Sequence, residues 1–139
     1  MDALDVELEV EGRPPRTVTS FVQVERALRA LKPYGRTTFA ILDRRDGSYL
    51  QVAGGQVSAT VELHRSDPLS ASGTWRAFLR DPRPNYTAPV TKHFGAGTLL
   101  LQPDEILWAD DVVAVFRQFA SGDDFPDVCG WRQARVHEA

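Results

Sequence analysis

The sequence predicts an α+β fold in which a single, mostly antiparallel β-sheet is packed by two helices. Three features predict it: short runs in which apolar and polar residues alternate, two segments with apolar residues at helical spacing, and tight turns between consecutive runs. The chain of 139 residues is 42% hydrophobic, which is enough for one core without disulfides or metals. Because no repeat, linker or low-complexity segment divides it, we expect residues 1–139 to form one domain.

The first expected strand is the run LDVELEVEG, in which apolar residues alternate with acids. A period of two places one set in the core and the other set on the opposite face of a sheet. The acidic row therefore faces solvent or a partner. The apolar set is Leu4, Val6, Leu8 and Val10, and the acidic set is Asp5, Glu7, Glu9 and Glu11.

The first expected helix follows the break in pattern at GRPPR. Ser20 with Gln23 three residues later has the form of a capping box, and apolar residues then recur from Phe21 to Leu31 at spacings of three and four. Proline disfavours a helical conformation in the residue before it, so the helix ends ahead of Pro33.

The second expected helix begins at Asp110 and Asp111, because negative charge is favourable at a helix N-terminus. Gly122 is expected to cap its C-terminus. Its apolar stripe consists of Val112, Val113, Phe116 and Phe119.

An antiparallel meander is expected between the two helices. TTFAIL and SYLQVA are joined by a turn containing Asp46 and Gly47, and VSATVELH follows the glycine pair at 54–55. Alternation in the third run places Val57, Ala59, Val61 and Leu63 inward. TWRAFL, APVTKHF, TLLLQ and EILW are further expected strands, and the first two belong to residues 65–97, which are rich in Pro, Gly and Ser.

Charge is unevenly distributed along the chain, although the net charge is only −3. Residues 1–12 carry five acids and no base, and residues 104–127 carry seven acids against Arg117 alone. Between them, residues 13–103 carry thirteen Lys/Arg and six acids. This segregation predicts surface patches of opposite sign, while the acidic balance argues against a dedicated nucleic-acid binder.

No motif in the sequence indicates catalysis or a bound metal. His64, His93 and His137 are far apart in sequence, and Cys129 has no nearby cysteine or histidine. A Gly-x-Ser-x-Gly elbow is absent, and FGAGT at 94–98 lacks the lysine of a phosphate loop, so it is expected to be a hairpin turn. We therefore expect no cofactor and no metal. Without a signal sequence or a bilayer-spanning apolar run, we expect a cytoplasmic protein.

The three tryptophans lie in or beside apolar runs. Burial in the core is the expectation for Trp75, Trp108 and Trp131. An exposed binding hot spot is the alternative for each of them.

The last third of the chain has a recognisable order: an apolar strand, a helix ending in Phe, a Gly, an acidic or polar turn with Pro, and then Trp. This order resembles the C-terminal pattern of immunity protein family 1 of bacterial polymorphic toxin systems. VERALRAL, TTFAIL, SYLQVAGG and VSATVEL also follow in the family's order, so the resemblance covers most of residues 4–135. SGDDFPDVCGW departs from it, being longer and more acidic than the family's compact turn. The matching residues are Val113, Phe116, Phe119, Gly122, Pro126 and Trp131.

The resemblance implies a small α+β cytoplasmic protein that binds and neutralises a cognate toxin domain, in many members a nucleic-acid deaminase or another nuclease-like toxin. It implies a protein partner, one toxin domain per chain, with no catalysis and no direct contact with nucleic acid or membrane. Structural roles then fall to Phe116, Phe119, Gly122, Pro126 and Trp131. Acids can cover the basic groove of a toxin that acts on nucleic acid. The candidate toxin-binding residues are Asp104, Glu105, Asp110, Asp111, Asp123, Asp124 and Asp127, with the acidic row of the first strand as a second patch.

Two other interpretations use the basic middle of the chain, residues 65–97. One is a small enzyme or anion-binding module with a pocket in this segment, and the other is a nucleic-acid-binding or regulatory module. The acids of the C-terminal third are then an ordinary solvated surface. The candidate pocket residues are Arg76, Arg80, Arg83, Asn85, Tyr86, Lys92 and His93.

Overall fold

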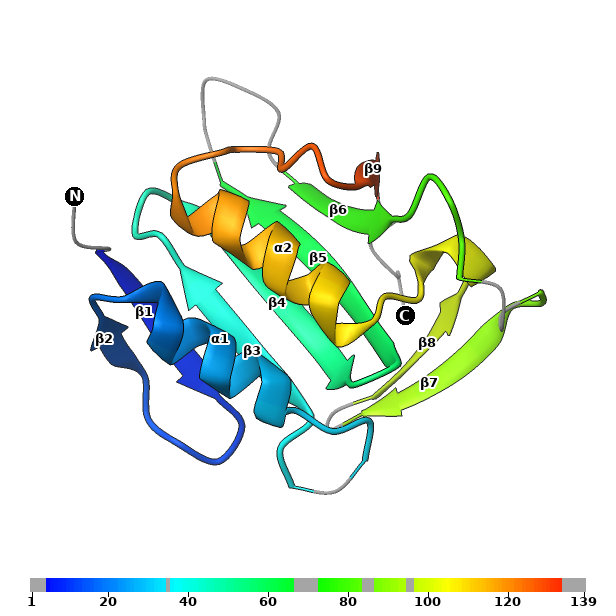
Figure 1. The fold of residues 1–139 in the computed structure, drawn as a ribbon, viewed down its shortest axis with the longest axis horizontal. Coiled ribbons are helices and arrows are strands. Elements are labelled where there is room, and N and C mark those ends of the chain that lie inside the picture. Colours follow the sequence, from blue (N-terminus) through cyan, green and yellow to red (C-terminus); the bar gives the residue numbers. More distant parts are fainter. Residues whose placement is uncertain (1–4, 35, 67–72, 84–86, 95–96, 134–139) are drawn as a thin grey trace.

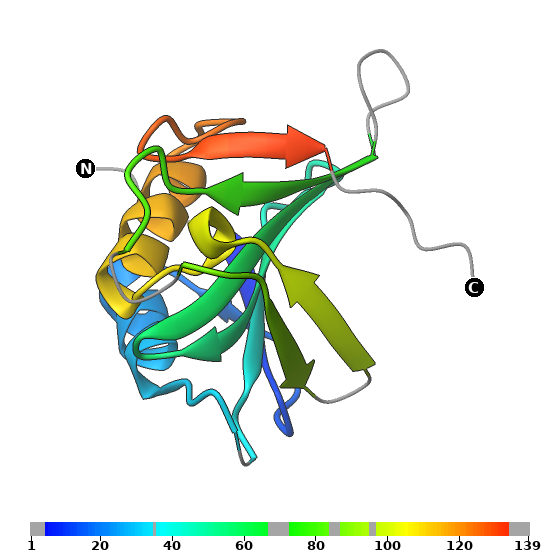
Figure 2. The ribbon, with the colours of Figure 1, turned by 90° about the vertical axis from the view of Figure 1, so that its right-hand side faces the viewer.

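The computed structural model describes residues 5–34, 36–66, 73–83, 87–94 and 97–133. A seven-stranded sheet carries helices α1 (Phe21–Ala30) and α2 (Ala109–Ala120) on one face, and a separate two-stranded hairpin projects beside it (Figures 1 and 2). The sheet has the order β2-β1-β3-β4-β5-β6-β9, and every neighbouring pair is antiparallel. The predicted α+β class is confirmed. Its strands are β1 (Val6–Val10), β2 (Arg16–Val18), β3 (Phe39–Asp43), β4 (Ser48–Gly55), β5 (Ser58–Arg65), β6 (Gly73–Phe78) and β9 (Gly130–Gln133), and the hairpin consists of β7 (Val90–Phe94) and β8 (Gly97–Leu101).

Strand β1 has the predicted alternation. Val6, Leu8 and Val10 are buried in the core on the helix side, so the acids of the row lie on the opposite face. The break at GRPPR does not end this region of the sheet, because the chain returns as β2, pairing Arg16 with Leu8. Two prolines occupy the connection, and the strand after them is a short edge strand, where missing amide donors are tolerated.

Strands β3, β4 and β5 form the predicted meander. Gly47 has φ +92° in the first turn, a backbone conformation that glycine adopts readily. In the third run, VSATVELH, the predicted inward orientation is correct for Ala59, Val61 and Leu63, which are buried. It is wrong for Val57, which is 54% exposed. Val57 precedes β5 and lies in the turn after β4, so strand alternation does not apply to it.

Gly55 explains the glycine pair at the end of β4. A Cβ atom added at this residue would lie 2.2 Å from the carbonyl oxygen of Leu31, where the chain leaves α1. The sheet and the end of the helix therefore touch through backbone atoms, which only glycine permits.

Helix α1 begins with the predicted capping box. The Ser20 hydroxyl accepts a hydrogen bond from Val22 N at 3.3 Å, and Gln23 Oε1 accepts one from Ser20 N at 3.3 Å. Val24 and Leu28 are buried against the sheet, and the helix ends at its C-cap residue, Leu31, ahead of Pro33 as predicted.

Helix α2 lies beside α1 and over β4 and β5 (Figure 1). Its buried face includes the predicted stripe and adds Val115. The carboxylate of Asp111 accepts a hydrogen bond from Trp108 N at 2.9 Å, which satisfies a free donor at the helix start. Gly122 follows the C-cap residue Ser121 with φ +111°, so its predicted capping role is confirmed. Neither helix of the described segments is sufficiently long and apolar to cross a bilayer.

The predicted strand in EILW is wrong. Pro103–Glu105 forms a short 3₁₀ helix, η1, and Leu107 makes only an isolated bridge to Ala59. Glu105 Oε1 accepts a hydrogen bond from Gln102 N at 2.8 Å and closes the turn, which competes with extended backbone. The predicted hairpin turn in FGAGT includes residues 95 and 96, which lie outside the described residues, although Phe94 pairs with Gly97 in an antiparallel register.

The expectation of buried tryptophans is correct only in part. Trp75, Trp108 and Trp131 are all half-buried, and the first and third pack against the margin of the core. Their size makes complete burial rare, and an indole edge can meet a polar partner at such a margin. Trp131 meets one, because its Nε1–H donates to the Pro126 carbonyl oxygen at 2.9 Å.

Candidate functional site

Residues 121–129 connect α2 to β9 without helix or strand, and we call this segment the acidic loop. Figure 1 shows it leaving the end of α2 and returning across the edge of the molecule to β9. Pro126 and Cys129 are buried, whereas the side chains between and before them are exposed. The loop is thus anchored at two residues and presents the rest to solvent. The exposed members are Asp123, Asp124, Phe125, Asp127 and Val128.

Arg44, which follows β3, holds the start of the acidic loop. Its Nη1–H donates to the carbonyl oxygens of Phe119 at 3.3 Å and Asp123 at 3.1 Å, so it caps the end of α2. Its Nη2–H donates to the carboxylate of Asp124 at 2.6 Å, and its guanidinium lies 4.4 Å above the Phe119 ring. The hydrogen bond from Arg44 holds the pKa of Asp124 below its usual value, with a further contribution from Arg65.

Further hydrogen bonds hold the end of the acidic loop. Gln118 of α2 donates to the Asp127 carboxylate at 2.9 Å and accepts from Val128 N at 3.3 Å. Arg80, after β6, donates to the Asp127 carbonyl oxygen at 2.8 Å. The loop is consequently fixed to a helix, to the chain after β3 and to the chain after β6, although it has no regular structure of its own.

Phe125 is the aromatic residue at the tip of this arrangement. It packs edge-on against Trp75 with ring centroids 5.3 Å apart, and against Trp131 with centroids 6.4 Å apart. The Arg65 guanidinium lies 5.4 Å from its ring centroid. Phe125 nevertheless remains 43% exposed, and Val128 is 44% exposed. The acidic loop therefore presents two apolar side chains, one of them held in an aromatic cluster.

Replacing Arg44 with methionine is expected to loosen the acidic loop. Methionine keeps the apolar contact with Phe119 and removes the donors to two carbonyl oxygens and to Asp124, as well as those to Asp46 in the turn after β3. We expect amide exchange of residues 123–128 to accelerate about tenfold or more, since each hydrogen bond to a charged donor contributes about 1.5–3 kcal/mol. Arg45→Met is the matched control, because Arg45 pairs with Asp5 and Glu7 instead. Equal acceleration in both variants would contradict the assigned role.

The seven predicted toxin-binding acids divide into three groups. Asp123 and Asp127 are exposed on the acidic loop, and Asp124 is there as well but pairs with Arg44 and Arg65. Asp110 is 83% exposed at the start of α2 and pairs with Arg29 at 2.9 Å. The remaining three are held in ion pairs at less exposed positions. They are Asp104, Glu105 and Asp111.

Asp111 has a structural role. Besides closing the start of α2, its carboxylate receives two hydrogen bonds from Arg83, whose guanidinium lies 4.3 Å above the Trp108 ring. Asp111 is therefore satisfied within the chain.

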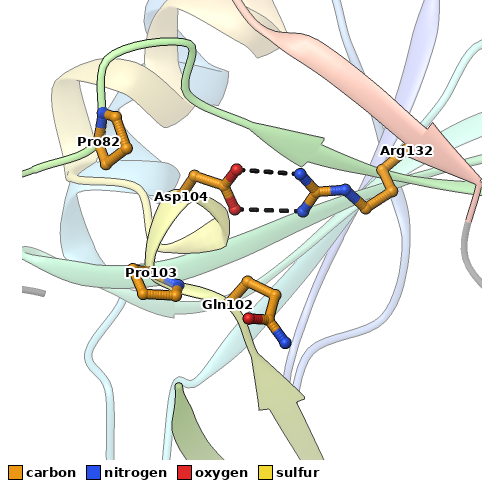
Figure 3. A pocket seen from close by; sticks show the side chains of 5 residues that line it. All are labelled: Pro82, Gln102, Pro103, Asp104 and Arg132. Carbon is orange, nitrogen blue, oxygen red and sulfur yellow. Dashed lines mark hydrogen bonds and ion pairs between the residues drawn. The ribbon is translucent and has the colours of Figure 1, made fainter. Parts of the chain in front are cut away.

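Asp104 and Glu105 belong to an ion-pair network on the sheet face opposite the helices. The Asp104 carboxylate receives two hydrogen bonds from Arg132 of β9, at 2.9 and 3.1 Å (Figure 3). Glu105 is only 3% exposed and lies between Arg132 at 2.9 Å and Arg76 of β6 at 3.5 Å. An open pocket of about 390 Å³ adjoins the Asp104–Arg132 pair, between Pro82 and Gln102. Because it is buried, Glu105 has no surface to offer a partner.

The same network continues along β5. Arg76 donates twice to Glu62, at 2.9 and 3.1 Å, and Glu62 lies 3.8 Å from His64 Nε2. Tyr49 stacks flat on the His64 ring with centroids 4.5 Å apart, and Thr74 Oγ1 lies 3.0 Å from His64 Nδ1. These side chains come from neighbouring strands, so strand pairing is what brings them together.

His64 is expected to make the protein less stable in mild acid. Its burial lowers the pKa of the imidazole, and the nearby Glu62 acts in the opposite direction without reversing the shift. The unfolded chain therefore takes up a proton at a higher pH than the folded chain does. Stability from this residue is present above the unfolded pKa of about 6.5 and is lost as the pH falls below it.

Urea unfolding at about pH 7.5 and pH 5.5, on either side of the unfolded imidazole pKa, measures this effect. We expect the free energy of unfolding to fall between the two, and His64→Gln to reduce that fall. The pKa values of Glu11, Asp46 and Asp124 are lowered, so these acids lose their protons well below this window. If the wild type and His64→Gln lose the same free energy of unfolding between the two pH values, His64 does not cause the loss.

The residues expected to have structural roles are placed accordingly. Phe116 and Phe119 are fully buried, and Pro126 is buried at the acidic loop. Trp131 packs at the margin of the core and bonds to Pro126, and Gly122 follows the end of α2. The fold therefore uses these five residues in the buried face of α2, at its C-terminus and in the return of the chain to β9.

The basic candidates of residues 65–97 do not share one partner. Arg76 pairs with Glu62 and Glu105, Arg80 donates to the Asp127 carbonyl oxygen, and Arg83 pairs with Asp111. Asn85 and Tyr86 lie outside the described residues. Lys92 and His93 belong to β7, on the separate hairpin. Arg76, Arg80 and Arg83 each already bind groups within the chain, so these three arginines do not favour an anion pocket.

The acidic row of β1 is also partly engaged. Asp5 and Glu7 lie near Arg45, and Glu11 accepts hydrogen bonds from Thr38 N at 2.8 Å and Thr38 Oγ1 at 2.7 Å. The start of this row lies near the start of the acidic loop, because Arg45 pairs with Asp5 and Glu7 and the neighbouring Arg44 pairs with Asp124.

Sequence reasoning did not identify Phe125, Val128 or Arg44 as site residues. The sequence did offer one signal for Phe125: it is a large apolar residue in an expected turn, between two acids and a proline. Arg44 offered none, because its partners in α2 and the acidic loop are more than 70 residues away in sequence.

Cys129 is an inert part of the site. Burial raises the pKa of its thiol to about 12, so it stays protonated and behaves as a small apolar side chain. Within the described segments, no three His, Cys, Asp or Glu residues are grouped to hold a metal ion. Comparison of the chain with known protein families, with curated proteins and with solved structures finds no match.

Proposed function

We propose that this chain is a cytoplasmic immunity protein that binds one cognate toxin domain and covers its active site or substrate groove. The observation that carries the proposal is the acidic loop, an irregular segment fixed by side-chain hydrogen bonds that still exposes Phe125 and Val128. Loops held by a rigid scaffold are common binding sites, and pre-organisation lowers the entropic cost of association. An exposed aromatic residue rimmed by charge suits a protein partner.

Charge supports a toxin that acts on nucleic acid, such as a deaminase. Such an enzyme presents basic residues around its substrate groove, because phosphate contacts supply much of its affinity. Asp123 and Asp127 on the acidic loop and Asp110 at the start of α2 are exposed acids that can attract such a surface. Asp104, Glu105, Asp111 and Asp124 instead stabilise the scaffold through arginine pairs.

Co-expression tests the proposal directly. The chain is produced in a bacterium together with the toxin domain encoded beside it in the native host. We expect growth to be restored and a complex with one copy of each chain to be recovered. A correctly folded chain that neither binds nor protects against any toxin domain encoded in its neighbourhood would overturn the proposal.

Reversing the charge of Asp123 and Asp127 to lysine is expected to slow toxin association about tenfold and weaken its salt dependence. Asp124 is left intact, because its carboxylate holds Arg44 and Arg65. Asp127→Lys also removes the hydrogen bond from Gln118, but Arg80 still binds the Asp127 carbonyl oxygen and holds this part of the loop. The control is Asp5→Lys with Glu9→Lys, which makes the same change in net charge on and beside β1. Stopped-flow association at two salt concentrations measures the effect. Equal rates for the two double variants would remove the acidic loop from the encounter surface.

A further inference from the structure

A small groove lies between helix α2 and the acidic loop, with a volume of about 100 Å³. Val115 and Cys129 are almost fully buried at its base, whereas Val128 is 44% exposed beside it. The walls are mainly apolar, and two carboxylates complete them. The lining residues are Leu79, Asp110, Asp111, Ala114, Val115, Val128 and Cys129.

The two carboxylates of the groove are not equivalent. Asp111 is engaged by Arg83 and by Trp108 N. Asp110 is 83% exposed, and among the residues that the structure describes, only Arg29 donates to it, at Oδ1. The second carboxylate oxygen of Asp110 is therefore available to a cation at the groove. The Cys129 thiol is neutral, because burial raises its pKa to about 12, so it adds apolar surface to the base.

We propose that this groove receives one arginine or lysine side chain of the partner protein. Long cationic side chains place an apolar stem along apolar surface and keep the charged head at a polar edge. Leu79, Ala114 and Val128 provide that surface, and Asp110 provides the edge. The identity of the partner as a toxin rests on the proposed function, whereas the chemistry of the groove does not.

Asp110 is the reason to expect a cationic occupant instead of a neutral one. The other groove carboxylate, Asp111, is already paired with Arg83. The exposed carboxylate of Asp110 has Arg29 as its one ion-pair partner among the described residues, so it can share its charge with a second cation.

Small probes test the groove without any toxin. The chain is titrated with N-acetyl-L-arginine amide while backbone amide chemical shifts are followed by NMR. N-acetyl-L-citrulline amide has nearly the same shape without the charge, and N-acetyl-L-norleucine amide keeps only the stem. We expect shifts at Ala114, Val128 and Cys129 with the arginine probe, and binding weaker by up to about fivefold with citrulline, as suits an exposed ion pair.

Three variants locate the binding. Asp110→Asn is expected to abolish the preference for arginine over citrulline, and Ala114→Met to fill the groove and abolish binding of both. Asp123→Asn, at a residue that does not line the groove, is expected to leave both unchanged. Equal binding of arginine, citrulline and norleucine probes, or no shift at the groove at saturating probe, would overturn the inference. Protection against a toxin by a chain whose groove binds no probe would reject the groove alone and leave the proposed function standing.

Discussion

Replacing Arg76 with methionine is expected to lower the free energy of unfolding by about 3 kcal/mol, the lower end of the cost of breaking a buried ion pair. Arg76 is the guanidinium shared by Glu62 and Glu105, and the Glu105 side chain is only 4% exposed. In the variant, Asp104 and Glu105 share Arg132, while Glu62 loses its arginine and keeps only the His64 ring at 3.8 Å among the described residues. Buried charge without a partner is costly, and methionine supplies none.

A second substitution shows whether charge is the cause. Adding Glu105→Gln to Arg76→Met removes the buried negative charge while preserving the shape of the side chain and its carbonyl acceptor for Gln102 N. We therefore expect the double variant to be more stable than Arg76→Met alone. Urea unfolding of the wild type, the two single variants and the double variant closes a thermodynamic cycle. Additive effects in that cycle would mean that Arg76 acts through Glu62 or through packing, not through Glu105.

The fold could be predicted where local physical chemistry decides the structure. Alternation in β1 and in the β3–β5 meander reflects a sheet with one buried face, and the Ser20–Gln23 box starts α1 through bonds within four residues. Helix α2 combines acids at its N-terminus with a stripe that suits only one face. In each case the residues that decide the structure are neighbours in sequence.

The site could not be predicted in the same way, because its contacts are long-range. Arg44 meets Asp124 from 80 residues away, and Arg76 meets Glu105 only because β6 lies beside η1. An acid-rich segment therefore predicted more free charge than the folded chain has. The strand predicted for EILW was wrong for a related reason. Glu105 closes a turn and pairs with two arginines from two strands, and the apolar residues that follow it do not indicate these contacts.

Replacing Phe125 with alanine is expected to weaken binding of the cognate toxin by about 2 kcal/mol or more, or roughly 30-fold in Kd, if the acidic loop is the interface. Phe125 is the large apolar side chain at the centre of the loop, and Trp75 and Trp131 hold its ring in place. A rigid aromatic residue loses little conformational entropy when a partner covers it.

The control for Phe125→Ala is Tyr34→Ala. Tyr34 is an exposed aromatic residue, 78% exposed, that follows α1 and is not part of the acidic loop. Calorimetric titration of both variants with the toxin domain, after thermal unfolding has shown that each is folded, compares one aromatic truncation with the other. Phe125 should act mainly on dissociation, because it forms contacts only once the partners have met, whereas the charge of Asp123 and Asp127 acts on the encounter. Equal losses of affinity in Phe125→Ala and Tyr34→Ala would place the interface away from the acidic loop. Loss of an aromatic side chain at the interface should weaken binding more than loss of an exposed aromatic side chain elsewhere.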